Sequence, residues 1–112
     1  MCGATYPLGP DIYAVKDRVA RTITGVEGDS IVVELQAEPW FMTGGPLTDV
    51  PVAQQVAMLP PAALRGHVHF AREARTSAIY RWGVEWWYRM EQAGHPEYVR
   101  EARVLLDEAR QD

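Results

Sequence analysis

The chain has 112 residues, of which 47% are hydrophobic and 23% charged, and a net charge of −4 at pH 7. This length indicates one domain, and the hydrophobic fraction excludes an intrinsically disordered chain. The acidity argues against a nucleic-acid partner, which requires a basic surface. No run of 18 apolar residues predicts a membrane span, and no signal peptide is visible, so the cytoplasm is the default location. The one cysteine, Cys2, excludes an internal disulfide.

The first half of the chain predicts two strands separated by a helix. Residues 3–6 (Gly-Ala-Thr-Tyr) are expected to form a short strand, because prolines and glycines follow directly. Residues 11–22 are expected to form an amphipathic helix. Its apolar residues recur every four positions, at Val15, Val19 and Ile23. Residues 30–38 begin with continuous β-branched residues, as in a buried strand of a parallel sheet.

The second half predicts one further strand among helices. A short helix is expected at 52–58, and a longer one begins at about Pro61. Residues 78–82 predict a strand ended by Gly83, and a helix is expected at 84–92. The last helix begins at Pro96. The expected inner faces of the two longer helices are Leu64, Val68 and Ala71, then Val99, Ala102, Leu106 and Ala109.

The predicted order is therefore three βα units, which favours a parallel sheet with helices outside it. In such folds, sites form where the strands end. Glu34, Gln36 and Glu38 share one face of the second strand, since side chains alternate along a strand. The third strand ends in the aromatic stretch 82–88, and the first ends at Tyr6. Carboxylates beside aromatic rings suit sugars, whose C–H faces pack on rings and whose hydroxyls donate to carboxylates.

These residues also resemble a known enzyme group. The string Val33-Glu34-Leu35-Gln36, with Trp82-Gly83 on the next strand, resembles the last part of the (β/α)8 glycoside hydrolases of clan A. Within it, Glu34-Leu35-Gln36 is similar to the seventh-strand motif of family 42 β-galactosidases, and Val33-Glu34-Leu35 resembles the Thr-Glu-Leu of family 10 xylanases. The longer strings 34–40 and 82–88 look like a group of bacterial barrel proteins of this type. The resemblance covers nearly the whole chain.

The resemblance implies that residues 1–112 are a single unit, the C-terminal part (strands six to eight) of a (β/α)8 barrel. Glu34 would be the nucleophile of a retaining glycosidase. Trp82 would be a platform for the sugar, and Tyr6 would hydrogen-bond the nucleophile. The rest of the cleft would be lined by Glu38, Trp40, Glu85 and Trp86. No metal or cofactor is expected.

The chain departs from this family in its length, because a complete barrel needs roughly 250 residues. The acid/base glutamate of the clan lies on the fourth strand, which is not present here. We therefore expect no efficient turnover by this chain alone. Glu38 or Glu85 could replace that glutamate only if its carboxyl group lies about 5–5.5 Å from that of Glu34.

Two other hypotheses remain open. The chain could be a small standalone carbohydrate-binding or self-associating module, a homo-oligomer that closes its open sheet edges. It could also be a gene fragment without a function of its own.

Individual candidate site residues also have interpretations that involve no function. Glu34 could be a solvated carboxylate, and Trp82 could be a core residue. Trp86 and Trp87 are adjacent and cannot share one helix face, so at least one is expected in the core. His67 and His69 are two apart and are not expected to ligate a metal together.

Overall fold

The computed structural model describes residues 8–42 and 44–111 and is rich in helix, which accounts for 59% of the described residues. Most predicted helices and strands are present within a few residues of their expected bounds. In chain order the elements are α1 (Asp11–Thr24), β1 (Ile31–Gln36), the 3-10 turn η1 (Leu47–Asp49), α2 (Val52–Met58), α3 (Pro61–Glu73), β2 (Ala78–Trp82), α4 (Val84–Gln92) and α5 (Glu97–Gln111).

The predicted fold class, a partial (β/α)8 barrel of three βα units, is wrong. The described residues form a small α-rich domain in which only two strands, β1 and β2, pair in parallel. The first predicted strand, residues 3–6 with the candidate residue Tyr6, lies outside the described residues. The physical reason is that helices, and not strands, supply most of the core. Its buried side chains come mainly from α3, α4 and α5, so packing between helices replaces the extended sheet that a barrel requires.

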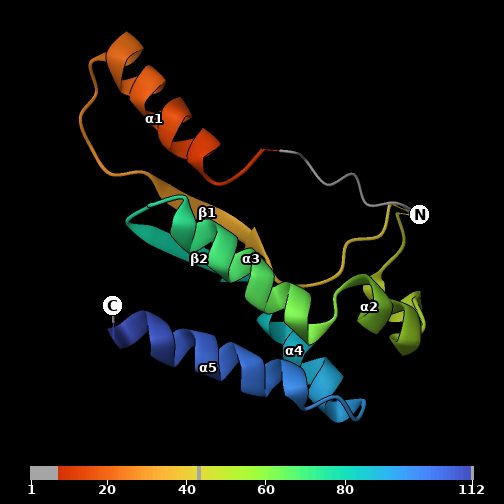
Figure 1. Ribbon diagram of the computed structural model, residues 1–112. Coiled ribbons are helices and arrows are strands. Elements are labelled where there is room, and N and C mark those ends of the chain that lie inside the picture. Colours follow the sequence, from red (N-terminus) through yellow and green to blue (C-terminus); the bar gives the residue numbers. More distant parts are fainter. Residues whose placement is uncertain (1–7, 43, 112) are drawn as a thin grey trace.

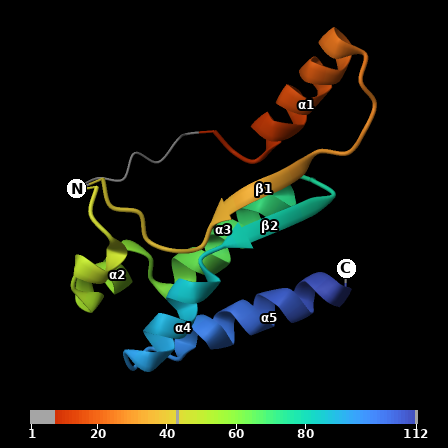
Figure 2. The same cartoon turned by 180° about the vertical axis from the view of Figure 1, so that it is seen from behind.

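The two-stranded sheet has one covered face and one open face. Helix α3 lies over one face (Figure 1), and no helix lies in front of the other (Figure 2). Leu35 pairs with Arg81 and packs against the core. As the partner of Leu35, Arg81 lies on the same face, and its Nη1 atom is buried. Burial, followed by the charge of Arg72 on α3, lowers the pKa of Arg81. Because side chains alternate, Tyr80 and Trp82 lie on the open face.

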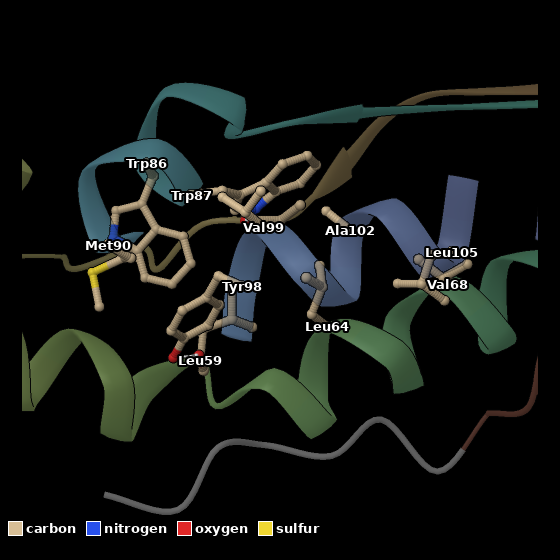
Figure 3. Packing of buried hydrophobic residues seen from close by; sticks show 11 residues of the cluster. Leu59, Leu64, Val68, Trp86, Trp87, Met90, Tyr98, Val99, Ala102 and Leu105 are labelled. Carbon is tan, nitrogen blue, oxygen red and sulfur yellow. Dashed lines mark hydrogen bonds between the residues drawn. The ribbon is translucent and has the colours of Figure 1, made fainter. Parts of the chain in front are cut away.

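The core lies between α3, α4 and α5 (Figure 3). On α3 the buried residues are Leu64, Val68 and Ala71, as predicted. On α5 they are Tyr98, Val99, Ala102 and Leu105. The prediction of Leu106 and Ala109 as inner residues is wrong, since both are exposed. Tyr98, Ala102 and Leu105 also follow a helical spacing. Toward the C-terminal end of α5, the buried residue is therefore Leu105 in place of the predicted Leu106.

Helix α1 matches its predicted position, but the described residues leave its apolar stripe uncovered. No side chain of α1 is buried, and Val15, Val19 and Ile23 are 53%, 50% and 78% exposed. Two contacts hold the helix to the rest of the structure. Ser30 Oγ donates a hydrogen bond to Asp17, and the Tyr13 ring meets the Phe70 ring edge-on at 6.0 Å.

Tyr98 predicts a pH dependence of stability. Its hydroxyl is fully buried and donates to the Leu59 carbonyl at 2.8 Å. Burial, and secondly the charge of Glu97, raise its pKa to about 12, against about 10 in the unfolded chain. The stability that the protonated hydroxyl contributes is therefore present below pH 10 and is lost as the pH rises toward 12.

We expect Tyr98→Phe to lower the free energy of unfolding by about 1 kcal/mol at pH 7, since one buried acceptor loses its donor. The wild type should lose stability more steeply than this variant between pH 10 and 12. Urea unfolding of both proteins across this range measures the difference. Tyr88→Phe is the control, because Tyr88 is 53% exposed. Identical pH profiles for the wild type and Tyr98→Phe would contradict the prediction.

Candidate functional site

Ala37 joins the carboxyl ends of the two strands. This residue directly follows β1 and is completely buried. Its N–H donates to the Trp82 carbonyl at 3.1 Å. Its own carbonyl accepts a hydrogen bond from Trp87 Nε1 of α4 at 2.7 Å. The end of β1 is thereby fixed to the end of β2 and to the first turns of the helix that follows.

Gly83 makes this close approach possible. Its φ is +119°, a conformation that L side chains rarely adopt. A Cβ atom added at Gly83 would lie 2.9 Å from both the carbonyl carbon and the oxygen of Ala37. Only glycine fits this position, and the residues that flank the contact, Glu38 on one side and Trp82 on the other, are therefore neighbours.

Two partly exposed tryptophans lie at this junction. The rings of Trp40 and Trp82 meet edge to face, with centroids 6.1 Å apart and planes at 79°. Trp40 is 61% exposed and Trp82 is 37% exposed. Aromatic pairs of this geometry stabilise one another. The pair presents two adjoining aromatic surfaces to solvent.

Two carboxyl groups accompany the tryptophans. Burial raises the pKa of Glu38, and the negative charge of Glu85 raises it further. Glu85 lies in the first turn of α4, directly after the Gly83 contact. Gln36 Nε2 donates to the Glu38 carbonyl at 2.8 Å and holds the backbone of this segment. We call the set Glu38, Trp40, Trp82 and Glu85 the aromatic–carboxylate site.

Of the other three predicted site residues, the two that the structure describes lie away from this site. Glu34, the predicted nucleophile, is exposed and lines a groove between α1 and α3. It lies where the register between β1 and β2 is irregular. Trp86 is only 2% exposed and packs against Tyr98 with ring centroids 4.6 Å apart. Tyr6 lies outside the described residues. The catalytic role of Glu34 stays a prediction from the family resemblance.

Both adjacent tryptophans of α4 are buried, which confirms the prediction that at least one lies in the core. They point in different directions, and α4 has partners on both sides. Trp86 donates from Nε1 to the Gln55 side chain at 2.7 Å, whereas Trp87 reaches Ala37. The buried role of Gln55 was not predicted from the sequence. Its position between Val52 and Leu59 at helical spacing places it on the apolar face of α2, and that spacing was the signal available.

The two neighbouring histidines form no metal site in the described part of the chain. His67 Nδ1 lies 3.3 Å from the Gln36 carbonyl oxygen. Among residues 8–42 and 44–111, no three or more His, Cys, Asp or Glu side chains are placed to hold a metal ion. In the same residues, no helix has the length and apolar character needed to cross a membrane.

The chain was compared with protein-family models, with curated proteins and with solved structures. None of the three comparisons returned a match.

Proposed function

We propose that this chain binds carbohydrate through the aromatic–carboxylate site. One observation carries the proposal. An exposed tryptophan pair lies beside two carboxyl groups at the joined carboxyl ends of β1 and β2. Binding sites in parallel α/β structures commonly form at this end of the strands.

The chemistry of the four side chains suits a sugar. The open faces of Trp40 and Trp82 offer apolar area for the C–H faces of a pyranose ring. The two carboxylates accept hydrogen bonds from sugar hydroxyls, and such charge-assisted bonds are stronger than neutral ones. Because the pKa of Glu38 is raised, this group retains its proton at a higher pH than a solvated carboxyl does.

The proposal is for binding and does not include hydrolysis. Retaining hydrolysis requires a nucleophile and an acid whose carboxyl groups lie about 5–5.5 Å apart across the sugar. Glu34, which the clan A resemblance assigns as nucleophile, lines the groove beside α1. The binding proposal rests on residues of the aromatic–carboxylate site and is independent of the role of Glu34.

A titration of intrinsic tryptophan fluorescence tests the proposal. Xylohexaose and β-1,4-galactobiose are suitable probes, because they represent the substrate classes of the two families that the motifs resemble. We expect one of them to change the emission of the wild type saturably. Trp82→Ala should weaken binding at least tenfold, which equals about 1.4 kcal/mol, and Glu85→Gln should weaken it less.

Tyr88→Ala is the matched control for the fluorescence titration. Tyr88 is an exposed aromatic residue of α4 at 53% exposure and lies outside the site, so its removal should leave the affinity unchanged. Circular dichroism checks that each variant is folded. The absence of a saturable signal with both sugars, or equal affinities of Trp82→Ala and the wild type, would refute carbohydrate binding at this site.

A further inference from the structure

The chain exposes more surface than a closed domain of its mass. Its accessible surface is 8273 Å² at a mass of 12.6 kDa, whereas a compact monomer of this mass exposes about 6,200 Å². Its radius of gyration is 16.1 Å, against about 13 Å for a compact domain of this length. The excess surface is larger than the roughly 800 Å² that each partner buries in a standard protein–protein interface.

Much of this surface surrounds a groove of about 930 Å³, which we call the α1–β1 groove. Its floor is the segment from Ser30 to Leu35. Its walls are the side of α1 that carries Tyr13 and Asp17 and the end of α3 from Phe70 onward. In both views α1 lies beside β1, and β2 lies on the other side of that strand (Figures 1 and 2). The groove therefore follows the edge of β1 that β2 does not occupy.

The free edge of β1 is suited to pairing with another strand. Among the described residues, β2 is the only strand bonded to β1. Ile31 and Val33 beside this edge are 49% and 66% exposed. An apolar edge strand without a proline presents unpaired N–H and C=O groups to any strand that can approach. Strand addition is a common mode of recognition at such edges.

Helix α1 needs a cover that the described chain does not supply. It has 14 residues and no buried side chain. Helices of this length are marginal in water unless an amphipathic face packs on something. The α1 stripe of Val15, Val19 and Ile23 is half exposed or more. The stripe is not part of the groove lining, because the groove wall is the side of α1 that carries Tyr13 and Asp17. The chain therefore has apolar surface without a described partner both on the strand floor of the groove and on the neighbouring side of α1.

We propose that the α1–β1 groove is an interface with a second copy of this chain. The two β1 strands pair antiparallel about a two-fold axis, which makes a four-stranded sheet. Each copy also covers the α1 stripe of the other, which lies beside the groove. The charges of the groove favour a like partner. It carries both Lys16 and Arg18 and the exposed Glu34. An isologous interface brings a patch against itself, so a patch of mixed sign can be self-complementary, whereas a patch of one sign repels itself.

This interface is separate from the aromatic–carboxylate site. Trp40, Trp82, Glu38 and Glu85 do not line the groove, and pairing at the free edge of β1 leaves the open face at Trp82 accessible. The dimer proposal therefore goes beyond carbohydrate binding and stands or fails independently of it. The homo-oligomer hypothesis from the sequence also closes an open sheet edge. The present proposal specifies the free edge of β1 and leaves the tryptophan pair outside the interface.

Size-exclusion chromatography with light scattering tests the interface on the whole chain. We expect the wild type to have twice the chain mass of 12.6 kDa. Val33→Lys places a charge at the strand edge, and Val19→Lys places one on the α1 stripe. Each should weaken dimerisation at least 100-fold and yield monomers. Leu106→Lys is the matched control, since Leu106 is 46% exposed on α5, away from the groove, and it should remain dimeric.

Circular dichroism of each variant shows whether a monomeric variant is folded. If Val33→Lys disturbs the strand, Val19→Lys still tests the proposal. A wild type that is monomeric up to its solubility limit would overturn the proposal. Dimers that persist in both Val33→Lys and Val19→Lys would place the interface elsewhere. Open-ended aggregates of the wild type would exclude a closed two-fold interface.

Discussion

Gly83→Ala is expected to lower the free energy of unfolding by about 3 kcal/mol. Two costs add in this variant. An L residue in a left-handed conformation loses about 1–2 kcal/mol, and the φ of Gly83 is +119°. The new Cβ must also displace the Ala37 backbone, which it meets at 2.9 Å, and overpacking of this kind typically costs 1–3 kcal/mol. The loss is a large fraction of the 5–15 kcal/mol that stabilises a typical domain.

Gly94→Ala separates the two costs. Gly94 also has a positive φ, +91°, but nothing lies within 4 Å of an added Cβ. We expect this variant to lose only the conformational cost. Urea unfolding followed by far-ultraviolet circular dichroism measures both values. Gly83→Ala should in addition change the near-ultraviolet spectrum of the Trp40–Trp82 pair, because the backbones that carry the two rings are pushed apart. Equal losses in the two variants would show that the contact with Ala37 has no energetic role.

Gln55→Leu is expected to lower the free energy of unfolding by about 3 kcal/mol, although leucine is more hydrophobic. Gln55 is completely buried. Its Nε2 donates to the carbonyls of Leu47 at 3.0 Å and Val50 at 2.6 Å, and its Oε1 accepts from Trp86 Nε1 at 2.7 Å. The substitution removes all three bonds. Each buried polar group left without a partner costs about 1–3 kcal/mol, part of which relaxation recovers.

Gln54→Leu is the matched control for Gln55→Leu, because Gln54 is the preceding residue of α2 and is exposed. We expect a change within about 0.5 kcal/mol there. Thermal or urea unfolding measures both variants. The emission of Trp86 provides a second measurement, since its indole N–H loses its acceptor only in Gln55→Leu. A stability of Gln55→Leu equal to that of the control would contradict the structural role assigned to the buried amide.

Local pattern predicted the individual elements well. The short helix α2 and the helix α4 have their predicted bounds, and β2 does as well. The reason is that proline, glycine and helical spacing act on neighbouring residues, whatever the rest of the chain does. The same local reasoning placed Glu38, Trp40, Trp82 and Glu85 near strand ends, and the structure places all four in the two segments that meet at Gly83 and Ala37. It had no means to find the contact between Gly83 and Ala37, which joins residues far apart in the sequence.

Long-range packing decided how the predicted helices and strands are arranged, which the sequence pattern did not specify. The alternation of strands and helices is compatible with a larger parallel sheet, and on that basis the sequence predicted three βα units. The described chain instead buries α3, α4 and α5 against each other and leaves one sheet face open. The resemblance to clan A hydrolases rests on short strings around Glu34 and Trp82, and such strings do not specify how many strands surround them.

The sequence by itself determined where helices and strands begin and end, because those boundaries depend on side chains and dihedral preferences within a few residues. Only the tertiary structure decided which faces are buried. Trp86 and Trp87 both enter the core because α4 has partners on two sides, and Gln55 is buried because three polar groups converge on it. The α1 stripe remains exposed because burial depends on a matching surface, and no pattern within one helix can supply that surface.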